Sequence, residues 1–187
     1  MKDMNVVERL RCYLRKSAFN KQGYTVNVEL SDMYRSLRFY FERHSDDIED
    51  REIVSKMTPE FQRSNDKWSL QRKIKYVENI LCGYQSEIKL FTVNNDLLDD
   101  CQIIDGLQRL TALDDWFKNK FKVFGEFYYS DFKDSPKRAP FVDTRLTVCI
   151  HRFDSLKGAV QYYIDINEGI SHSEADIIKA RKYLESL

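Results

Sequence analysis

The sequence has no excess charge, since 30 Lys and Arg residues balance 30 Asp and Glu residues. A protein that holds duplex DNA mainly through its phosphates is expected to be basic, so only a local basic face is left for that role. No run approaches the roughly 18 apolar residues of a membrane span, and the first residues lack the apolar segment of a signal peptide. We therefore expect a cytoplasmic protein with no membrane partner.

Several chemical motifs are also missing. The cysteines lie far apart without Cys-x-x-Cys spacing, which argues against a zinc site and against a disulfide framework. The sequence contains no Gly-x-x-x-x-Gly-Lys-Ser/Thr phosphate loop, no Gly-x-Gly-x-x-Gly and no His-x-x-x-His pair. The histidines are His44, His151 and His172. They are too far apart in the sequence for a His-Asn-His nuclease module to be visible.

What is present is typical of one globular domain. A chain of 187 residues with 42% hydrophobic residues buries roughly 70% of its unfolded surface. Helical spacing of apolar residues predicts helices over 6–18, 33–41, 70–82, 107–120, 156–167 and 174–187. Alternation or short apolar runs predict strands over 24–30, 53–57, 87–93, 121–129 and 142–153. A further short strand is predicted to end at residue 105.

Three polar features are explained most simply without a function. The basic face of the helix over 6–18 is a candidate for nucleic acid but is typical of a solvated face. The charged run 43–52 lacks calcium-loop spacing and reads as a solvated loop. His151, at the end of a predicted strand, is expected to be structural.

The most informative stretch is 101–113, where an apolar strand breaks at Asp105-Gly106 and resumes with helical spacing. Asp105 can cap the new helix, and Gly106 lets the backbone approach a ligand at a helix start that suits an anion. Asp105 and Gln108 can equally form a plain capping box. Arg109 faces the positive end of the helix dipole at a cost of about 0.3–1 kcal/mol unless an anion is near, which a bound phosphate would explain.

These residues also carry a family resemblance. Residues 104–111 resemble the Asp-Gly-Gln-Gln-Arg-Leu-Thr signature of the ParB/sulfiredoxin-like N-terminal domain of GmrS-type, modification-dependent restriction proteins. Residues 59–63, Pro-Glu-Phe-Gln-Arg, with the later Trp68 resemble the family's Pro-x-Phe-Gln-Arg segment and its Trp. Residues 166–176 resemble its Asn-x-Gly-Gly turn and Ser-capped helix. The landmarks occur in family order over about residues 53–187.

The resemblance implies an α+β fold, with a ParB/sulfiredoxin-like mixed sheet flanked by helices. The whole chain, 1–187, would be a single domain, with 1–52 as a helical N-terminal extension and 53–187 as the motif-bearing core. The sequence departs from the family at Leu107, where the family has Gln, and at Ile170, where it often has Gly.

The resemblance further implies a site for a nucleoside triphosphate, GTP, ATP or CTP, with Mg²⁺. The catalytic set would be Asp105, Gln108 and Arg109, with Asp105 also holding the metal or orienting a water. The nucleotide-binding set would be Gln62, Arg63, Gly106, Arg109, Thr111 and Asn167. Because one arginine cannot balance a triphosphate, we expect the segment around Gln62 to lie beside the turn at Asp105.

The implied function is nucleotide binding and hydrolysis linked to DNA restriction and modification, phage defence or DNA processing. Partners would then include DNA or a separate nuclease or host protein. A non-catalytic interaction protein of a phage or mobile element, acting on a host system, is the competing class. A DNA nuclease is a third, although no group of carboxylates has clear two-metal spacing.

Overall fold

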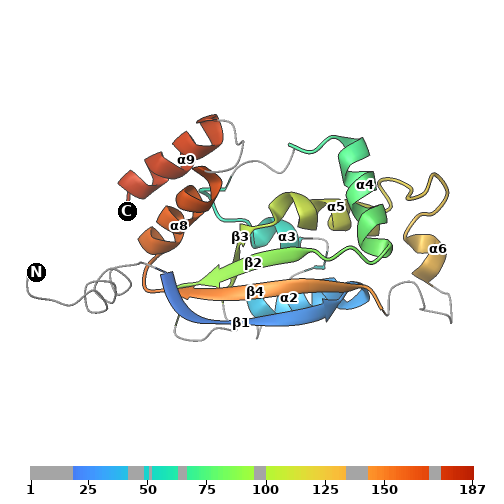
Figure 1. Cartoon of the computed structure of the whole chain (residues 1–187), viewed down its shortest axis with the longest axis horizontal. Coiled ribbons are helices and arrows are strands. Elements are labelled where there is room, and N and C mark those ends of the chain that lie inside the picture. The colour runs from blue at the N-terminus through green and yellow to red at the C-terminus, as the bar shows by residue number, and fades with distance from the viewer. Residues whose placement is uncertain are drawn as a thin grey trace, which may run out of the picture.

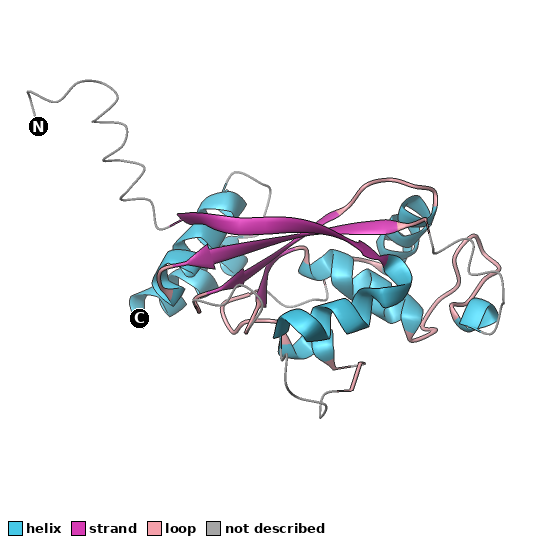
Figure 2. Cartoon of the chain, turned by 90° about the horizontal axis from the view of Figure 1, so that it is seen from below, coloured by secondary structure: helices cyan, strands magenta, loops and turns pink. Residues whose placement is uncertain are grey.

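The computed structural model of the chain describes residues 19–41, 49–50, 52–62, 67–94, 100–133, 143–168 and 174–187. The helix predicted over 6–18, Arg63 and most of the polar run 43–52 lie outside these residues. The described part forms a sheet with helices around it (Figures 1 and 2). None of its helices combines the length and the apolar character that crossing a membrane requires.

The sheet has four strands in the order β1-β4-β2-β3. Its strands are β1 (Phe19–Glu29), β2 (Glu87–Thr92), β3 (Gln102–Asp105) and β4 (Arg145–Phe153). β1 and β4 pair antiparallel, β2 and β4 parallel, and β2 and β3 antiparallel. The sheet is therefore mixed, and the expected α+β class is confirmed.

The helices are a 3₁₀ turn over Leu30–Asp32, α2 (Met33–Phe41), α3 (Ile53–Lys56), α4 (Leu70–Leu81), α5 (Leu107–Phe117), α6 (Ser130–Lys133), α8 (Leu156–Glu168) and α9 (Glu174–Glu185). α8 and α9 pack together near one end of the sheet, and α4 and α6 lie toward the other (Figure 1). α5 runs between these groups and packs against α4. It directly follows β3, so its first turn lies at the edge of the sheet.

Two apolar clusters form the core. The larger joins the sheet to α2, α3, α4 and α5 and contains the fully buried Trp116. The smaller joins α8 and α9 to Phe61, Phe91 and Ile104. α5 belongs to the larger cluster and is buried on nearly every side, including its polar residues Asp114 and Asp115. Such burial fixes the position of its N-terminus.

The structure corrects two predicted strands. Residues 53–56 form α3 instead of a strand, because the Met57 N–H donates to the Ile53 carbonyl and the Thr58 hydroxyl donates to the Val54 carbonyl. Residues 121–129 form only an isolated bridge between Val123 and Phe127 around a turn, because the chain reverses there through left-handed residues at 124 and 125.

The division of the chain at residue 52 also needs correction. β1 pairs with β4 along its length, and the core includes Met33 and Leu37 of α2. Residues 19–41 therefore belong to the same sheet and core as the segment from 53 onward, and are not a separate helical extension. The reason is that β4 has a second edge, which β1 covers.

Candidate functional site

The turn between β3 and α5 requires glycine. Gly106 has φ +100°, in the left-handed region where a side chain is strained. A Cβ on this residue would lie 2.6 Å from Ile88 Cδ1 of β2. The predicted break in the chain is thus confirmed, and both backbone conformation and close packing on β2 account for Gly106.

Asp105 does not cap α5. Gly106 occupies the N-cap position without a side-chain cap, and Asp105 is the last residue of β3. The Asp105 carboxylate turns toward Arg109, whose Nη2 donates to Oδ2 at 2.9 Å. The expected cap is therefore wrong, because Gly106 takes the N-cap position and the Asp105 carboxylate binds the Arg109 side chain instead of the first N–H groups. The Asp105 carboxylate is therefore the nearby anion that the sequence predicted for Arg109.

Gln108 is engaged elsewhere as well. Its side chain is buried, and its Oε1 accepts a hydrogen bond from the Trp68 backbone N–H at 3.1 Å. The capping box of Asp105 with Gln108 is therefore also wrong, because each side chain has a different partner. Gln108 instead links the start of α5 to Trp68, two residues before the start of α4.

The segment containing Gln62 lies beside β3. The buried Gln62 Nε2 donates to the Ile103 carbonyl at 2.8 Å, and the Met57 carbonyl accepts from the Ile103 N–H at 2.8 Å. Lys179 of α9 holds the segment from the other side, since its Nζ donates to the Gln62 carbonyl at 2.6 Å. The structure thus brings together the two sequence-distant segments around Gln62 and Asp105.

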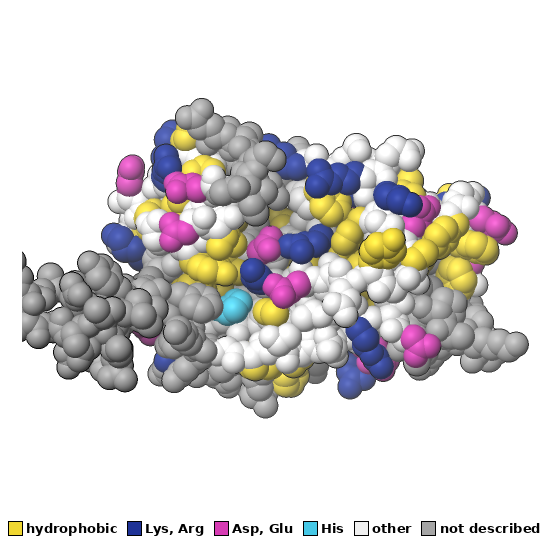
Figure 3. All heavy atoms as spheres, in the orientation of Figure 1, with side chains coloured by type: hydrophobic (Ala, Val, Ile, Leu, Met, Phe, Trp, Pro, Cys, Tyr) yellow, Lys and Arg dark blue, Asp and Glu magenta, His cyan; other side chains and the backbone are white. Residues whose placement is uncertain are grey.

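A pocket of about 260 Å³ opens between the turn at Asp105 and the start of α4. Its lining consists of Trp68, Arg72, Asp105, Gly106, Leu107, Gln108 and Arg109. Charged side chains of both signs gather in the middle of the face shown in Figure 3. Four of the predicted site residues, at positions 105, 106, 108 and 109, therefore share one pocket.

The charges around the pocket favour an anion. α4 and α5 both begin there, and neither has an acidic residue in its first turn. Arg72 and Arg109 are each the third residue of their helix. The positive end of the helix dipole destabilises a cation at this position by about 0.3–1 kcal/mol. Among the described residues of the lining, Asp105 is the single carboxylate, against these two guanidinium groups. Lys89 lies opposite Asp105 in the β2–β3 register, but its Nζ pairs with Glu87 at 3.6 Å, so these two residues together add no net charge nearby.

Both arginines have partners in this structure, and both keep access to solvent. The Arg109 side chain is 29% exposed and that of Asp105 is 38% exposed, so their pair is open. The Arg72 guanidinium carbon lies 4.6 Å from the centroid of the Trp68 ring. Ion pairs and cation–π contacts at such exposed positions are weak, so an entering anion can compete for both groups.

Three predicted nucleotide-binding residues that the structure describes do not line this pocket, and one of them, Gln62, binds the Ile103 carbonyl of β3 instead. Thr111 is buried on the face of α5 that also carries Gln108 and Asp115, and its hydroxyl has no hydrogen-bond partner within the described residues. Asn167 is buried in α8, where its Nδ2 donates to the Tyr163 carbonyl at 2.6 Å. The positions of Thr111 and Asn167 are set by helix packing, which the motif alone did not reveal.

The pocket also contains residues that the sequence did not assign to it. Trp68 was only a landmark of the resemblance, and Arg72 was not singled out. The available signal was the Ser69 cap, whose Oγ accepts from the Arg72 N–H at 3.3 Å and starts α4. A cap at 69 predicts that Trp68 and Arg72 both lie at the helix start. It does not predict that this helix start lies beside α5.

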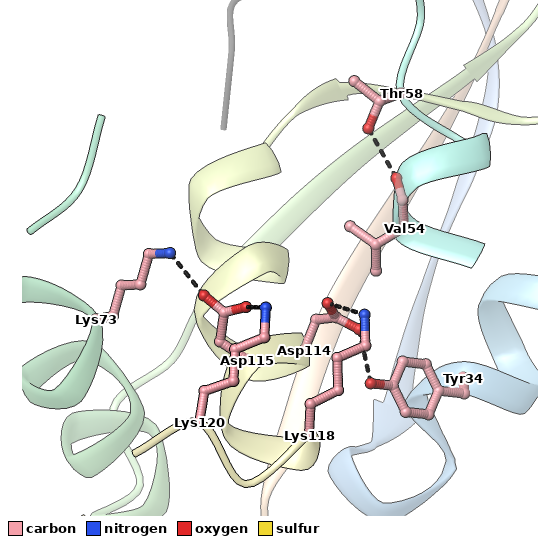
Figure 4. A network of polar contacts seen from close by, with 8 residues as sticks. All are labelled: Tyr34, Val54, Thr58, Lys73, Asp114, Asp115, Lys118 and Lys120. Carbon is pink, nitrogen blue, oxygen red and sulfur yellow. Dashed lines mark hydrogen bonds and ion pairs between the residues drawn. The ribbon is translucent and has the colours of Figure 1, made fainter. Parts of the chain in front are cut away.

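Two buried aspartates hold α5 against its neighbours (Figure 4). Asp115 accepts hydrogen bonds from Lys73 of α4 and from Lys120, both at 2.6 Å. Burial raises the pKa of Asp115, but hydrogen bonds from the two lysines outweigh it and hold the pKa below its usual value. The ion pair of Lys73 with Asp115 thus holds α4 against α5 at a second point. This point lies more than one helical turn further along both helices than the hydrogen bond of Trp68 with Gln108.

Asp114 makes the second set of contacts in this network. The Tyr34 hydroxyl donates to Asp114 Oδ1 at 2.7 Å, and Lys118 Nζ donates to Oδ2 at 2.6 Å. Burial and the hydrogen bond to Asp114 raise the pKa of Tyr34 far above its usual value. Tyr34 belongs to α2, so this contact joins α2 to α5 on the side away from α4 (Figure 4).

Comparison with known proteins finds no relative, since no protein-family model, no curated protein and no solved structure matches the chain. Within the ranges that the structure describes, no group of three or more His, Cys, Asp or Glu side chains could hold a metal ion by itself. A Mg²⁺ ion usually takes only one or two carboxylates together with substrate phosphates. Asp105 is the residue in the pocket whose chemistry fits that arrangement.

Proposed function

We propose that the pocket at the start of α5 binds the phosphates of a nucleoside triphosphate. The observation that carries this proposal is the convergence of Arg72 and Arg109, each at the positive end of its own helix, on one pocket. Two helix N-termini and two guanidinium groups form a site for a multiply charged anion. The resemblance of residues 104–111 to the nucleotide-handling family motif supports the same ligand.

Different residues of the pocket would contact different parts of the nucleotide and its metal ion. Gly106 allows the phosphates to approach the backbone at the start of α5, and Arg109 and Arg72 contribute positive charge. The resemblance adds Arg63 as a third cation. Asp105, with the phosphates, would hold Mg²⁺, which supplies further charge neutralisation when it is bound.

Hydrolysis is the second part of the proposal. In such a reaction water attacks the terminal phosphorus, the bond to the bridging oxygen breaks, and nucleoside diphosphate, phosphate and a proton are released. This chemistry needs positioning and charge neutralisation more than a protein nucleophile. Phosphates that draw Arg109 away from Asp105 would release the carboxylate, which would then either hold Mg²⁺ or orient the water. Gln108 would act through Trp68, by fixing the two walls of the pocket.

One observation favours the competing interaction protein. Leu107, at the position where the family has a polar Gln, is buried and apolar. A contact that such a Gln would make to ligand or water is therefore lost. Nucleotide binding without hydrolysis would suit a protein that recognises a host partner in a nucleotide-dependent way, while binding with hydrolysis would suit a role in DNA restriction or processing.

Calorimetric titration with ATP, GTP, CTP and UTP, with and without Mg²⁺, tests the proposal. We expect at least one triphosphate to bind, and Arg109→Ala to weaken it by about tenfold or more, as loss of a charge-assisted hydrogen bond does. Arg145→Ala is the matched control, because Arg145 pairs with Glu29 on the sheet outside the pocket. Equal loss in both variants, or no binding by the wild type, would overturn the assignment. Phosphate release measured on the same samples separates hydrolysis from binding.

A further inference from the structure

Trp68 is the aromatic side chain that lines the pocket, and its orientation is fixed. Its backbone N–H donates to Gln108 Oε1, and its ring packs against Tyr76 with centroids 5.3 Å apart and planes at 68°. Tyr76 is itself anchored, since its hydroxyl lies 2.6 Å from Ser86 Oγ. The indole is thus held in place while remaining only partly buried.

Arg72 covers one side of this ring. Its guanidinium carbon lies 4.6 Å from the ring centroid, and the side chain is otherwise exposed on α4. A guanidinium is planar and stacks on an aromatic face, as a nucleobase does. An exposed cation–π contact is weak, so another flat group can replace it. The ring face therefore suits an aromatic ligand at the edge of a pocket that favours anions.

We propose that Trp68 is the platform on which the base of the bound nucleotide stacks. This inference rests on the proposed nucleotide site and specifies its ligand class. The ligand must carry an aromatic base together with its phosphates, which excludes inorganic polyphosphate and sugar phosphates as preferred ligands. When the base occupies the ring, the Arg72 guanidinium turns toward the phosphates that Arg109 also contacts. One arginine thus serves as a cover in the free protein and as a phosphate ligand in the complex.

The test compares inorganic tripolyphosphate with each nucleoside triphosphate by calorimetry. We expect the wild type to bind its best nucleotide at least about fivefold more tightly than tripolyphosphate, the lower end of what base stacking on an aromatic side chain contributes. Trp68→Leu should remove that difference without weakening tripolyphosphate binding, because loss of the ring leaves the Arg72 guanidinium free to contact phosphate. Trp68→Phe, which keeps a ring, should retain most of it. Tyr84→Leu is the matched control, because Tyr84 is an exposed aromatic residue beyond the other end of α4.

Two results would overturn the base platform while leaving the nucleotide site in place. One is equal affinity of the wild type for nucleotide and tripolyphosphate, and the other is unchanged nucleotide affinity in Trp68→Leu. A loss of both ligands in Trp68→Leu and in Trp68→Phe would mean that Trp68 only shapes the pocket, which also contradicts the inference. Failure of the wild type to bind either ligand would instead remove the proposed function and the platform together.

Discussion

Arg109 donates a hydrogen bond to Asp105 at 2.9 Å across the turn between β3 and α5. This pair gives the first-turn cation a partner inside the protein, so a bound phosphate is not needed to keep it there. It also sets up a competition, because an entering phosphate and Asp105 would both attract the same guanidinium. The behaviour of this pair therefore distinguishes an anion site from a structural ion pair.

Asp105→Asn should strengthen Mg²⁺-free nucleotide binding by about three- to tenfold, since it removes a charge that repels phosphate and competes for Arg109. With Mg²⁺ present this gain should disappear, because a carboxylate that holds the metal is lost. Calorimetry under both conditions checks this, with Asp131→Asn as an exposed control outside the pocket. A weaker Mg²⁺-free complex in Asp105→Asn would mean that Asp105 supports binding by itself and does not compete with the ligand.

Gly106→Ala should destabilise the fold by about 2–4 kcal/mol, combining the left-handed backbone with overpacking against Ile88. Gly83→Ala is a close control, because Gly83 has φ +91° but no atom within 4 Å of its Cβ position. It should lose only the backbone part, about 1–2 kcal/mol. Ile88→Val should partly rescue Gly106→Ala, since it removes the Cδ1 atom that the new methyl meets. Denaturant unfolding measures all of these, and equal costs at both glycines would contradict the close packing.

Asp115→Asn should lower the free energy of unfolding at neutral pH by about 2 kcal/mol, because charge-assisted hydrogen bonds from Lys73 and Lys120 are lost. The pKa of Asp115 is lowered in the folded protein, so its contribution is present above the ordinary value of 3.8 and is lost as pH falls below it. The difference between wild type and variant should therefore shrink as the pH is lowered from 5 to about 3. Unfolding curves across this range check the prediction, and a difference independent of pH would contradict it.

Tyr34→Phe should cost about 1 kcal/mol, the usual value for one hydrogen bond, because Asp114 keeps its contact with Lys118. The raised pKa of Tyr34 means that the folded state holds this proton more tightly than the unfolded state. Its contribution is therefore full below the ordinary pKa of 10.0 and falls as the pH rises above that value. Unfolding measured between pH 8 and about 11 should show a steeper loss in the wild type than in Tyr34→Phe. Parallel curves would rule out this linkage.

Local patterns predicted much of the fold. β3, the break at Gly106 and α5 were visible because a short apolar run, an Asp-Gly pair and helical spacing follow one another. The run at 53–57 misled, because a few apolar residues fit both a strand and one helical turn. The aromatic-rich run 121–129 also resembled a strand, yet Phe124 and Gly125 both adopt left-handed conformations that reverse the chain.

The site was only partly visible for a different reason. The turn at Asp105 and Gly106 is contiguous in sequence, so its residues were found together. The direction in which the Asp105 and Gln108 side chains point depends on Arg109 and on Trp68, and a capping-box pattern cannot report this. Arg72 enters the pocket only through the packing of α4 on α5, a tertiary contact that no spacing within either helix encodes.

The most direct test of nucleotide binding at the start of α5 is an affinity measurement on the double variant Arg72→Ala, Arg109→Ala. Its affinity for a nucleoside triphosphate is measured without Mg²⁺ and compared with that of the wild type. If both guanidinium groups bind the same phosphates, the wild type should bind saturably and the double variant should lose about 100-fold or more in affinity, as expected for two charge-assisted contacts. The ligand-free thermal midpoint should change little, because both arginines oppose the dipoles of their helices. Undiminished binding by the double variant, or no saturable binding by the wild type, would contradict nucleotide binding at the start of α5.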